Sequence, residues 1–274
     1  MTSILTNTSS MVALQTLRSI NTNLTDVQNE ISTGKTIATA SDNSSMWAIS
    51  KVMESDVAGF NAVADSLSFG ESTVTVASAG AEQITDILKD MKQKIVAATG
   101  ENVDHDQLTI DIDEMKATIT DIISGSQFNG ANLLNTAGGD ITVLSSLDRA
   151  ANGAVTAKNI TVASVDFEAN LDLTTIDVSD SAAADTSLAA IEALIQTAVD
   201  GAAQLGASAA HISEQNEFVK RVTDAMKTGI GTLVDADMEE ASARLQALQV
   251  QQQLGVQALS IANQAPQTIL SLFR

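Results

Sequence analysis

Residues 245–273 read LQALQVQQQLGVQALSIANQAPQTILSLF and contain no charged side chain. Charge ends at Arg244 and returns only at Arg274. A membrane-spanning helix needs about 20 mostly apolar residues, whereas eight glutamines interrupt this segment. Uncharged amides can hydrogen-bond to one another away from water. The stretch therefore indicates a helix that is buried inside a protein assembly.

The N-terminal end has the same character. No charge precedes Arg18, and apolar residues then recur at alternating steps of three and four, which places an apolar seam on one side of a helix. The C-terminal segment carries a second apolar stripe beside its first, and a lone helix pair cannot bury both. We therefore expect both termini to be disordered in solution and to fold on assembly. The expected assembly positions are Leu17, Ile20, Leu24, Val27, Ile31, Leu245, Leu248, Leu254, Leu259, Ile261, Leu270, Leu272 and Phe273.

The composition excludes several kinds of partner. A net charge of −20 over 274 residues would repel nucleic acid and anionic membranes. The chain has no cysteine, so it has neither disulfides nor thiolate metal ligands, and its single proline, Pro266, permits very long helices. No basic region and apolar core precede Arg18, so we expect export, if it occurs, without a cleaved leader.

The C-terminal half predicts a coiled-coil-like helix. From Leu188 to Leu233, seam positions step by three and four, and only Asn216 and Thr223 among them are polar. The seam then shifts by one residue at Asp235-Ala236-Asp237, which indicates a joint. The polar residues Asn216 and Gln252 either fix the register of the packed helices or are merely tolerated in their seams. The expected rod packing positions in both halves are Met46, Ile49, Met53, Phe60, Leu188, Ile191, Ile195, Leu205, Ile212, Val219 and Met226.

The predicted fold is mainly α: a long antiparallel helical rod with coiled-coil-like packing and a small β-hairpin section. Gly59, Gly70 and Gly80 interrupt the N-terminal run, so we expect local irregularity there. Residues at about 136–182 are β-branched and bounded by glycine turns, which predicts one or more hairpins. We place an inner core domain at 1–41 and 235–274 and a rod domain at 42–234.

No constellation points to an enzyme. His105 stands between two aspartates, which could suggest a metal site, but the only other histidine is His211. We expect His105 to lie in a solvated loop between two helices. No HExxH motif is present, and no nucleophile, paired carboxylates or metal ligands are placed together. We interpret Trp47 as a residue that packs at the start of the rod. We therefore expect no catalytic residue, cofactor or metal.

Three motifs carry a family resemblance. Residues 24–47, LTDVQNEISTGKTIATASDNSSMW, resemble the N-terminal signature of bacterial flagellins, in which a Ser-Thr-Gly-Lys turn precedes an Ala-x-Asp-Asn element. Residues 126–134, SQFNGANLL, resemble the turn after the third rod helix of that family. Residues 251–255, 262–267 and 270–274 are similar to the flagellin C-terminus nearly throughout.

The resemblance implies an extracellular homopolymer, the helical filament used for swimming. The terminal helices would form its inner core around a channel, the rod would form the next shell, and the short β section suggests a minimal flagellin. Export through the flagellar type III apparatus, a dedicated chaperone, a filament cap and hook-associated proteins are the implied partners.

One departure concerns the second rod helix. Flagellins recognised by the animal Toll-like flagellin receptor carry an arginine-rich element there, whereas this chain has Asp90 in place of the key arginine. From this departure we expect the protein to evade that receptor. The same sequence pattern is typical of the short flagellins of alphaproteobacteria. Two alternatives stay open: a hook–filament junction protein, which shares similar terminal helices, and a secreted adhesion or binding module.

Overall fold

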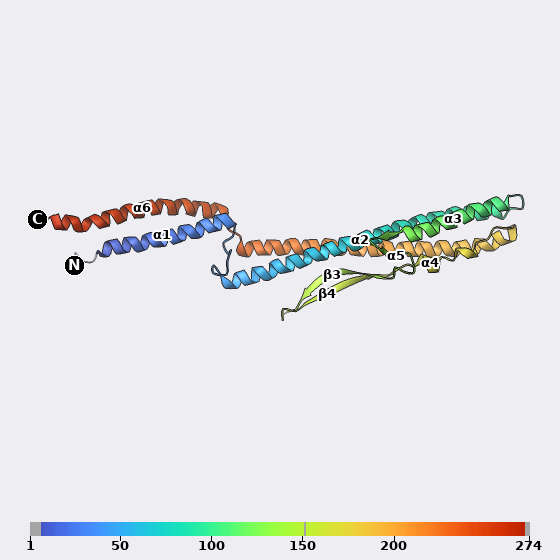
Figure 1. Ribbon diagram of the computed structural model, residues 1–274, viewed down its shortest axis with the longest axis horizontal. Coiled ribbons are helices and arrows are strands. Elements are labelled where there is room, and N and C mark those ends of the chain that lie inside the picture. Colours follow the sequence, from blue (N-terminus) through green and yellow to red (C-terminus); the bar gives the residue numbers. More distant parts are fainter. Residues whose placement is uncertain (1–6, 151, 272–274) are drawn as a thin grey trace. The chain divides into compact units, whose positions relative to one another are not determined.

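A computed structural model describes residues 7–150 and 152–271, with side chains as far as Gln264 (Figure 1). The described part is mainly helical, as the sequence predicts. Its elements in chain order are α1 (Thr8–Thr33), α2 (Ser44–Ala98), α3 (His105–Gly125), β1 (Gln127–Phe128), β2 (Ala131–Asn132), β3 (Ile141–Arg149), β4 (Val155–Val162), α4 (Phe167–Asn170), a 3-10 turn (Leu173–Thr175), α5 (Ser181–Val234) and α6 (Met238–Ser271).

The chain divides into two compact units. The terminal unit joins both ends of the chain, up to Asp56 and from Ala225 onward, and the rod unit comprises Val57–Asp224. Both divisions fall inside long helices, α2 and α5, so the same two helices contribute to each unit.

Three helices pack side by side in the rod unit (Figure 1). The α2 and α5 helices run antiparallel, because Ser68 contacts Asn216, whereas Lys92, 24 residues later in α2, contacts Glu192, 24 residues earlier in α5. Lys94 of α2 forms an ion pair with Asp111 of α3, with the two charged groups 2.6 Å apart. The buried core of this unit contains Val63, Leu67, Val74, Ile84, Leu88, Met91, Ile95, Ile112, Ile119, Ile191, Leu205, Ile212 and Val219.

The expected irregularity at the α2 glycines is wrong. The α2 helix is continuous over 55 residues. A Cβ at Gly59 would lie 2.6 Å from Leu147, a Cβ at Gly70 would collide with Val143, and one at Gly80 would collide with Ser126. The three glycines therefore make room for the chain segments that pack across α2, and that close packing offsets their poor helix propensity.

The β section is smaller than predicted. Strands β3 and β4 form an antiparallel hairpin with an irregularity between Leu144 and Ser146, which confirms a hairpin. Residues 163–180 are not strand, however, and contain α4 and the 3-10 turn. Buried Phe167 anchors α4, since its ring lies against the space left by Gly201 of α5. Tertiary packing of this side chain therefore overrides the β-branched character of the segment.

His105 is not in a loop as expected. It begins α3, and its Nδ1 lies 3.0 Å from the carbonyl oxygen of Val178. Lys116 of α3 similarly donates to the carbonyl oxygen of Ile176 at 2.9 Å. These two side chains fix the segment that leads into α5.

Candidate assembly interface

The terminal unit is built around the pairing of α1 with α6, which lie along each other (Figure 1). Gly255 allows a close approach, because a Cβ there would lie 2.9 Å from Leu17 Cδ1. Only Val27 of α1 and Ala241 of α6 are fully buried in the described parts of these helices. The seam residues that are half-buried between them are Leu17, Ile20, Leu24, Ile31, Leu245, Leu248 and Leu259.

Uncharged polar groups cross the same pairing. Asn7 Nδ2 donates to the carbonyl oxygen of Ala262 at 2.7 Å, and Gln252 Nε2 donates to Asn21 Oδ1 at 2.7 Å. Ser10 Oγ donates to Asn263 Oδ1 at 2.6 Å. Amide and hydroxyl groups therefore satisfy one another without introducing charge, as the composition of the C-terminal segment indicates.

The outer faces of both helices keep large apolar side chains exposed. Leu254 is 57% exposed and Ile261 is 69% exposed, although both were predicted assembly positions. Met11, Val12, Val250 and Val256 are also more than half exposed. The predicted set thus divides into residues between the two helices and residues facing outward. The side chain of Leu270, and all of Leu272 and Phe273, lie outside the described residues.

The two chain segments that leave this pair are tied together. Gly34 ends α1 with a left-handed φ of 69°, a conformation that glycine adopts without a Cβ clash. Lys35 then forms an antiparallel bridge with Asp235, in which Thr36 N donates to the carbonyl oxygen of Val234 at 2.8 Å and Ala236 N donates to that of Gly34 at 2.9 Å. The sequence located the break at 235–237, but it gave no sign of this pairing.

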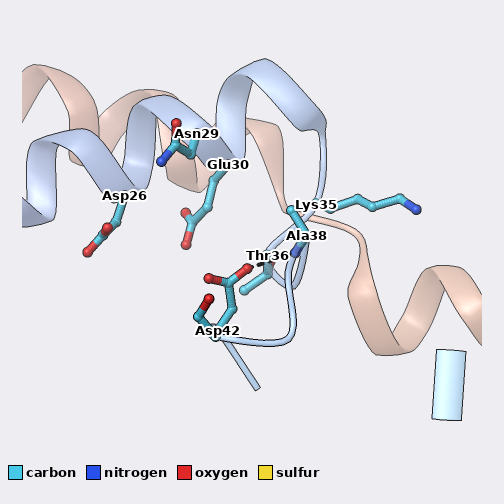
Figure 2. Close-up of a pocket in the computed structure, with 8 residues that line it drawn as sticks. Asp26, Asn29, Glu30, Lys35, Thr36, Ala38 and Asp42 are labelled. Atoms are coloured by element: carbon cyan, nitrogen blue, oxygen red, sulfur yellow. Dashed lines mark hydrogen bonds between the residues drawn. The ribbon is translucent and has the colours of Figure 1, made fainter. Parts of the chain in front are cut away.

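An acidic cleft of about 430 Å³ lies beside this tie (Figure 2). The carboxylates of Glu30 and Asp42 face the same space, while Lys35 points away from it to Glu54 at 3.3 Å. The Thr39 backbone N–H, which donates to Asp42 at 2.8 Å, lowers the pKa of that carboxyl below its usual value, with help from Ala38. No group of acidic, histidine or cysteine side chains suited to a metal ion occurs within residues 7–150 and 152–271.

The predicted rod packing positions differ in burial. Phe60, Ile191, Leu205, Ile212 and Val219 are buried, whereas Met53, Leu188, Ile195 and Met226 are half-buried.

Met46 and Ile49 are 38% and 48% exposed, contrary to the prediction that they pack in the rod. Met53 reaches Gly229, with its methyl group 3.3 Å from the position a Cβ would take there. Because the helices are antiparallel and Asn216 lies beside Ser68, the end of α5 at Val234 lies near the level of Ser50, so Met46 and Ile49 extend past it.

Asp90 lies exposed on α2, where its charge is available to solvent. Its basic neighbours are engaged elsewhere: Lys89 pairs with Asp86 at 3.0 Å, and Lys92 contacts Glu192 of α5. The surface around Asp90 therefore has no cluster of free basic side chains of the kind an arginine-rich element would provide.

Comparison with known proteins gives the family. The model of the bacterial flagellin N-terminal helical region matches residues 4–138, and that of the C-terminal helical region matches residues 188–273. A flagellin of Brucella melitensis is 43% identical over 282 residues, with 100% of both chains covered. Flagellin FljM of Caulobacter vibrioides is 42% identical over 277 residues, covering 99% of this chain and 98% of that protein.

The crystal structure of a Bacillus cereus flagellin is 23% identical, with a TM-score of 0.48, and covers 55% of this chain and 86% of that chain. The two family models and the full-length relatives show that the chain belongs to the bacterial flagellin family. The predicted likeness to alphaproteobacterial flagellins is confirmed by the Brucella and Caulobacter relatives. No helix in the described part of the chain is long and apolar enough to cross a membrane.

Proposed function

We propose that the chain is the structural subunit of a flagellar filament and that its two terminal helices are the polymerisation element. The observation that carries this is the exposed apolar face of α1 and α6. Leu254 and Ile261 lie on a segment without charge and remain in water in the single chain. Burying apolar surface away from water lowers the free energy. Further copies of the same chain would cover this surface.

The geometry expected of such contacts is heterologous. When one surface of a subunit binds a different surface of the next, and the rotation does not close a ring, identical subunits form an open helical filament. We assign residues 1–41 and 235–274 to the inner core of the filament and 42–234 to the surrounding rod. Both residues of the Lys35–Asp235 bridge belong to the segments that we assign to the core.

The role is structural, without catalysis or a cofactor. The chain would leave the cell through the flagellar export apparatus, held beforehand by a dedicated chaperone. Assembly would take place beneath a filament cap, on hook-associated proteins. The full-length flagellin relatives support this proposal, and nothing in the comparisons favours a junction protein or an adhesion module.

The direct test is seeded assembly. Purified full-length chain and a chain ending at Asp235 are each added to short filament seeds and observed by electron microscopy. Long tubular filaments from the full chain alone support the proposal. Persistent monomers or short stubs from the full chain would contradict it and favour a junction protein.

Point variants sharpen the same test without removing a helix. Leu254→Ser and Ile261→Ser should leave the melting temperature of the monomer nearly unchanged, because both side chains are exposed, but should strongly reduce growth from seeds. The matched control is Ile110→Ser, whose side chain is 55% exposed on α3 of the rod unit. Normal growth of both terminal variants would contradict the assignment of α6.

A second proposal concerns Asp90. Its exposed carboxylate would oppose a receptor surface that binds arginine, so the filament protein would escape the animal flagellin receptor. A reporter cell line treated with wild-type protein and Asp90→Arg tests this. No response to the wild type is expected, and a response at ordinary flagellin doses would contradict the proposal.

A further inference from the structure

The methionines of the chain differ in exposure between its two units. All but the first of the eight methionines lie in the described residues. In the rod unit, Met91 has no exposed surface and Met115 is half-buried. In the terminal unit, Met11 is 66% exposed, Met46 is 38% exposed and Met238 is 44% exposed. Every exposed methionine of the described chain therefore belongs to the terminal unit.

Met11 lies in the most exposed part of the apolar surface on the terminal helices. Ser10, the residue before it, donates to Asn263 of α6 at 2.6 Å, so Met11 lies at the level of Ile261 on the paired helix. Met11, Val12 and Ile261 are 66%, 64% and 69% exposed, the highest values of any large apolar side chain in the described residues. The Met11 thioether is thus part of the surface that we assign to polymerisation.

A thioether in this position is open to attack on a peroxide. The sulfur lone pair attacks one oxygen of hydrogen peroxide, an S–O bond forms and the O–O bond breaks. After proton transfer, the products are methionine sulfoxide and one molecule of water. Sulfur loses two electrons and the peroxide gains them. The chain has no cysteine, so no thiol of its own competes for the oxidant.

The sulfoxide has different consequences before and after assembly. Oxidation turns a flexible apolar side chain into a polar one. In the single chain, the new oxygen at Met11 is hydrated because the side chain is exposed. When a neighbouring copy covers the surface, the oxygen loses this water among apolar side chains such as Val12 and Ile261. Burying a polar group without a hydrogen-bond partner is unfavourable, so the oxidised surface resists burial.

We propose that Met11 is a peroxide-sensitive modification site, at which oxidation to the sulfoxide prevents the unassembled subunit from joining a filament. This inference rests on the proposed filament function. Assembly protects the sulfur in turn, since a second copy of the chain covers it. Because Met91 is fully buried, the rod core is shielded and the oxidised subunit stays folded. Methionine sulfoxide reductases reverse the reaction, so the block is reversible.

Peptide mass spectrometry after timed exposure to hydrogen peroxide, quenched with catalase, tests the site. In wild-type monomer, Met91 should oxidise about ten-fold more slowly than Met11 or slower still, because its sulfur is buried. In wild-type filaments, Met11 should oxidise about ten-fold more slowly than in the monomer. Equal rates for Met11 in monomer and filament would overturn the proposal without any variant being made.

Growth from filament seeds tests the consequence. Oxidation of full-length wild-type protein should raise the critical concentration for growth about ten-fold, as expected for burial of one unpaired polar group. Treatment with methionine sulfoxide reductases of both epimer specificities, with dithiothreitol as reductant, should restore it. Thermal melting should be the same before and after oxidation. A lost melting transition would overturn the proposal, because the growth defect would then report unfolding.

Two variants assign the effect to one sulfur, each compared with its own untreated protein. Met11→Leu has no sulfur at this position, so peroxide should change its critical concentration less than about two-fold. The matched control is Met46→Leu, which should keep the ten-fold sensitivity of the wild type because Met11 is intact. Undiminished sensitivity of Met11→Leu, or resistance of Met46→Leu, would overturn the assignment to Met11.

The untreated wild type separates the two levels of failure. If untreated wild-type protein does not extend seeds, the proposed filament function fails. If it extends seeds, and protein with Met11 fully oxidised extends them equally well, only the peroxide-sensitive site fails.

Discussion

The rod unit and the terminal unit use the same aliphatic residue types but differ in how far they bury them. In the rod unit, Leu67, Ile84, Leu88 and Met91 have no exposed surface. In the described parts of α1 and α6, only Val27 and Ala241 are buried, although both helices are rich in apolar residues. The rod surrounds its core with three helices and a hairpin, whereas two paired helices can cover only the stripe between them.

This difference separates folding from assembly. Ordering a residue costs about 1–2 kcal/mol of backbone entropy, and full burial of a leucine or isoleucine returns about 1.5–3 kcal/mol. The rod unit obtains the stabilisation from burying leucine and isoleucine within a single chain. The terminal helices gain it only in part, because residues such as Leu254 and Ile261 remain in water. We therefore infer that the rod is stable alone and that neighbouring copies complete the terminal pair.

The largest effect on the monomer is expected from Leu88→Ala in the rod. Its side chain has no exposed surface, so the truncation should lower the free energy of unfolding by about 2–5 kcal/mol. Urea denaturation measures the change. Val96→Ala, eight residues further along α2 and 52% exposed, is the control and should change stability by less than about 0.5 kcal/mol. Equal losses would contradict the closed core assigned to the rod.

Gly70→Ala should have the next largest effect. The new methyl group would collide with Val143 and push β3 away from α2, which should lower the free energy of unfolding by about 1–3 kcal/mol. Gly206→Ala on α5 is the matched control. Nothing lies within 4 Å of its Cβ position, so improved helix propensity should raise stability by about 0.5–1 kcal/mol. The opposite signs are the test, and chemical denaturation of both variants shows whether they occur.

Asn216→Leu should stabilise the rod slightly. Asn216 is 4% exposed and donates to Ser68 Oγ at 3.2 Å, but its Oδ1 is buried without a hydrogen-bond partner in the described structure. Ser68 still donates to the carbonyl oxygen of Ala64 at 2.9 Å when the amide is removed. We expect a gain of about 1 kcal/mol by thermal or urea unfolding. A loss of similar size would show that the amide is fully satisfied, for example by water.

The smallest effect is expected at Asp42. Because backbone donors lower the pKa of its carboxyl in the folded chain, its contribution is full above the unfolded value of 3.8 and is lost as pH falls through the lower folded value. The stability difference between wild type and Asp42→Asn should therefore shrink in acid. Thermal melts from pH 7 to 2 measure it, and a difference that grows on acidification would have the wrong sign.

The sequence predicted the parts of the fold that follow from local periodicity. The three-and-four steps before Leu233 predicted α5, and the shift at Asp235-Ala236-Asp237 predicted its end, since a seam must face one neighbour at a time. The turn in which Asn129 and Gly130 both have positive φ was predicted differently, from the resemblance of residues 126–134 to the flagellin family.

Features that depend on distant partners were missed. Gly70 alone indicates a weak point in a helix, and only the position of Val143, more than 70 residues later, shows that it makes room for a strand. Met46 and Ile49 have the correct spacing for packing, but the sequence does not show that α5 ends before it reaches them. The groove lined by Phe69, Phe128 and Val143 likewise needs three separate segments and has no local signature.

Hydrogen exchange of the monomer and of the assembled filament tests the central claim most directly. We predict that amides of residues 8–33 and 238–271 exchange rapidly in the monomer and are protected in the filament, while those of the rod core around Leu88 are protected in both states. Strong protection of both terminal helices in the monomer, equal to that of the rod, would contradict the account, because the pair would then be complete without its neighbours.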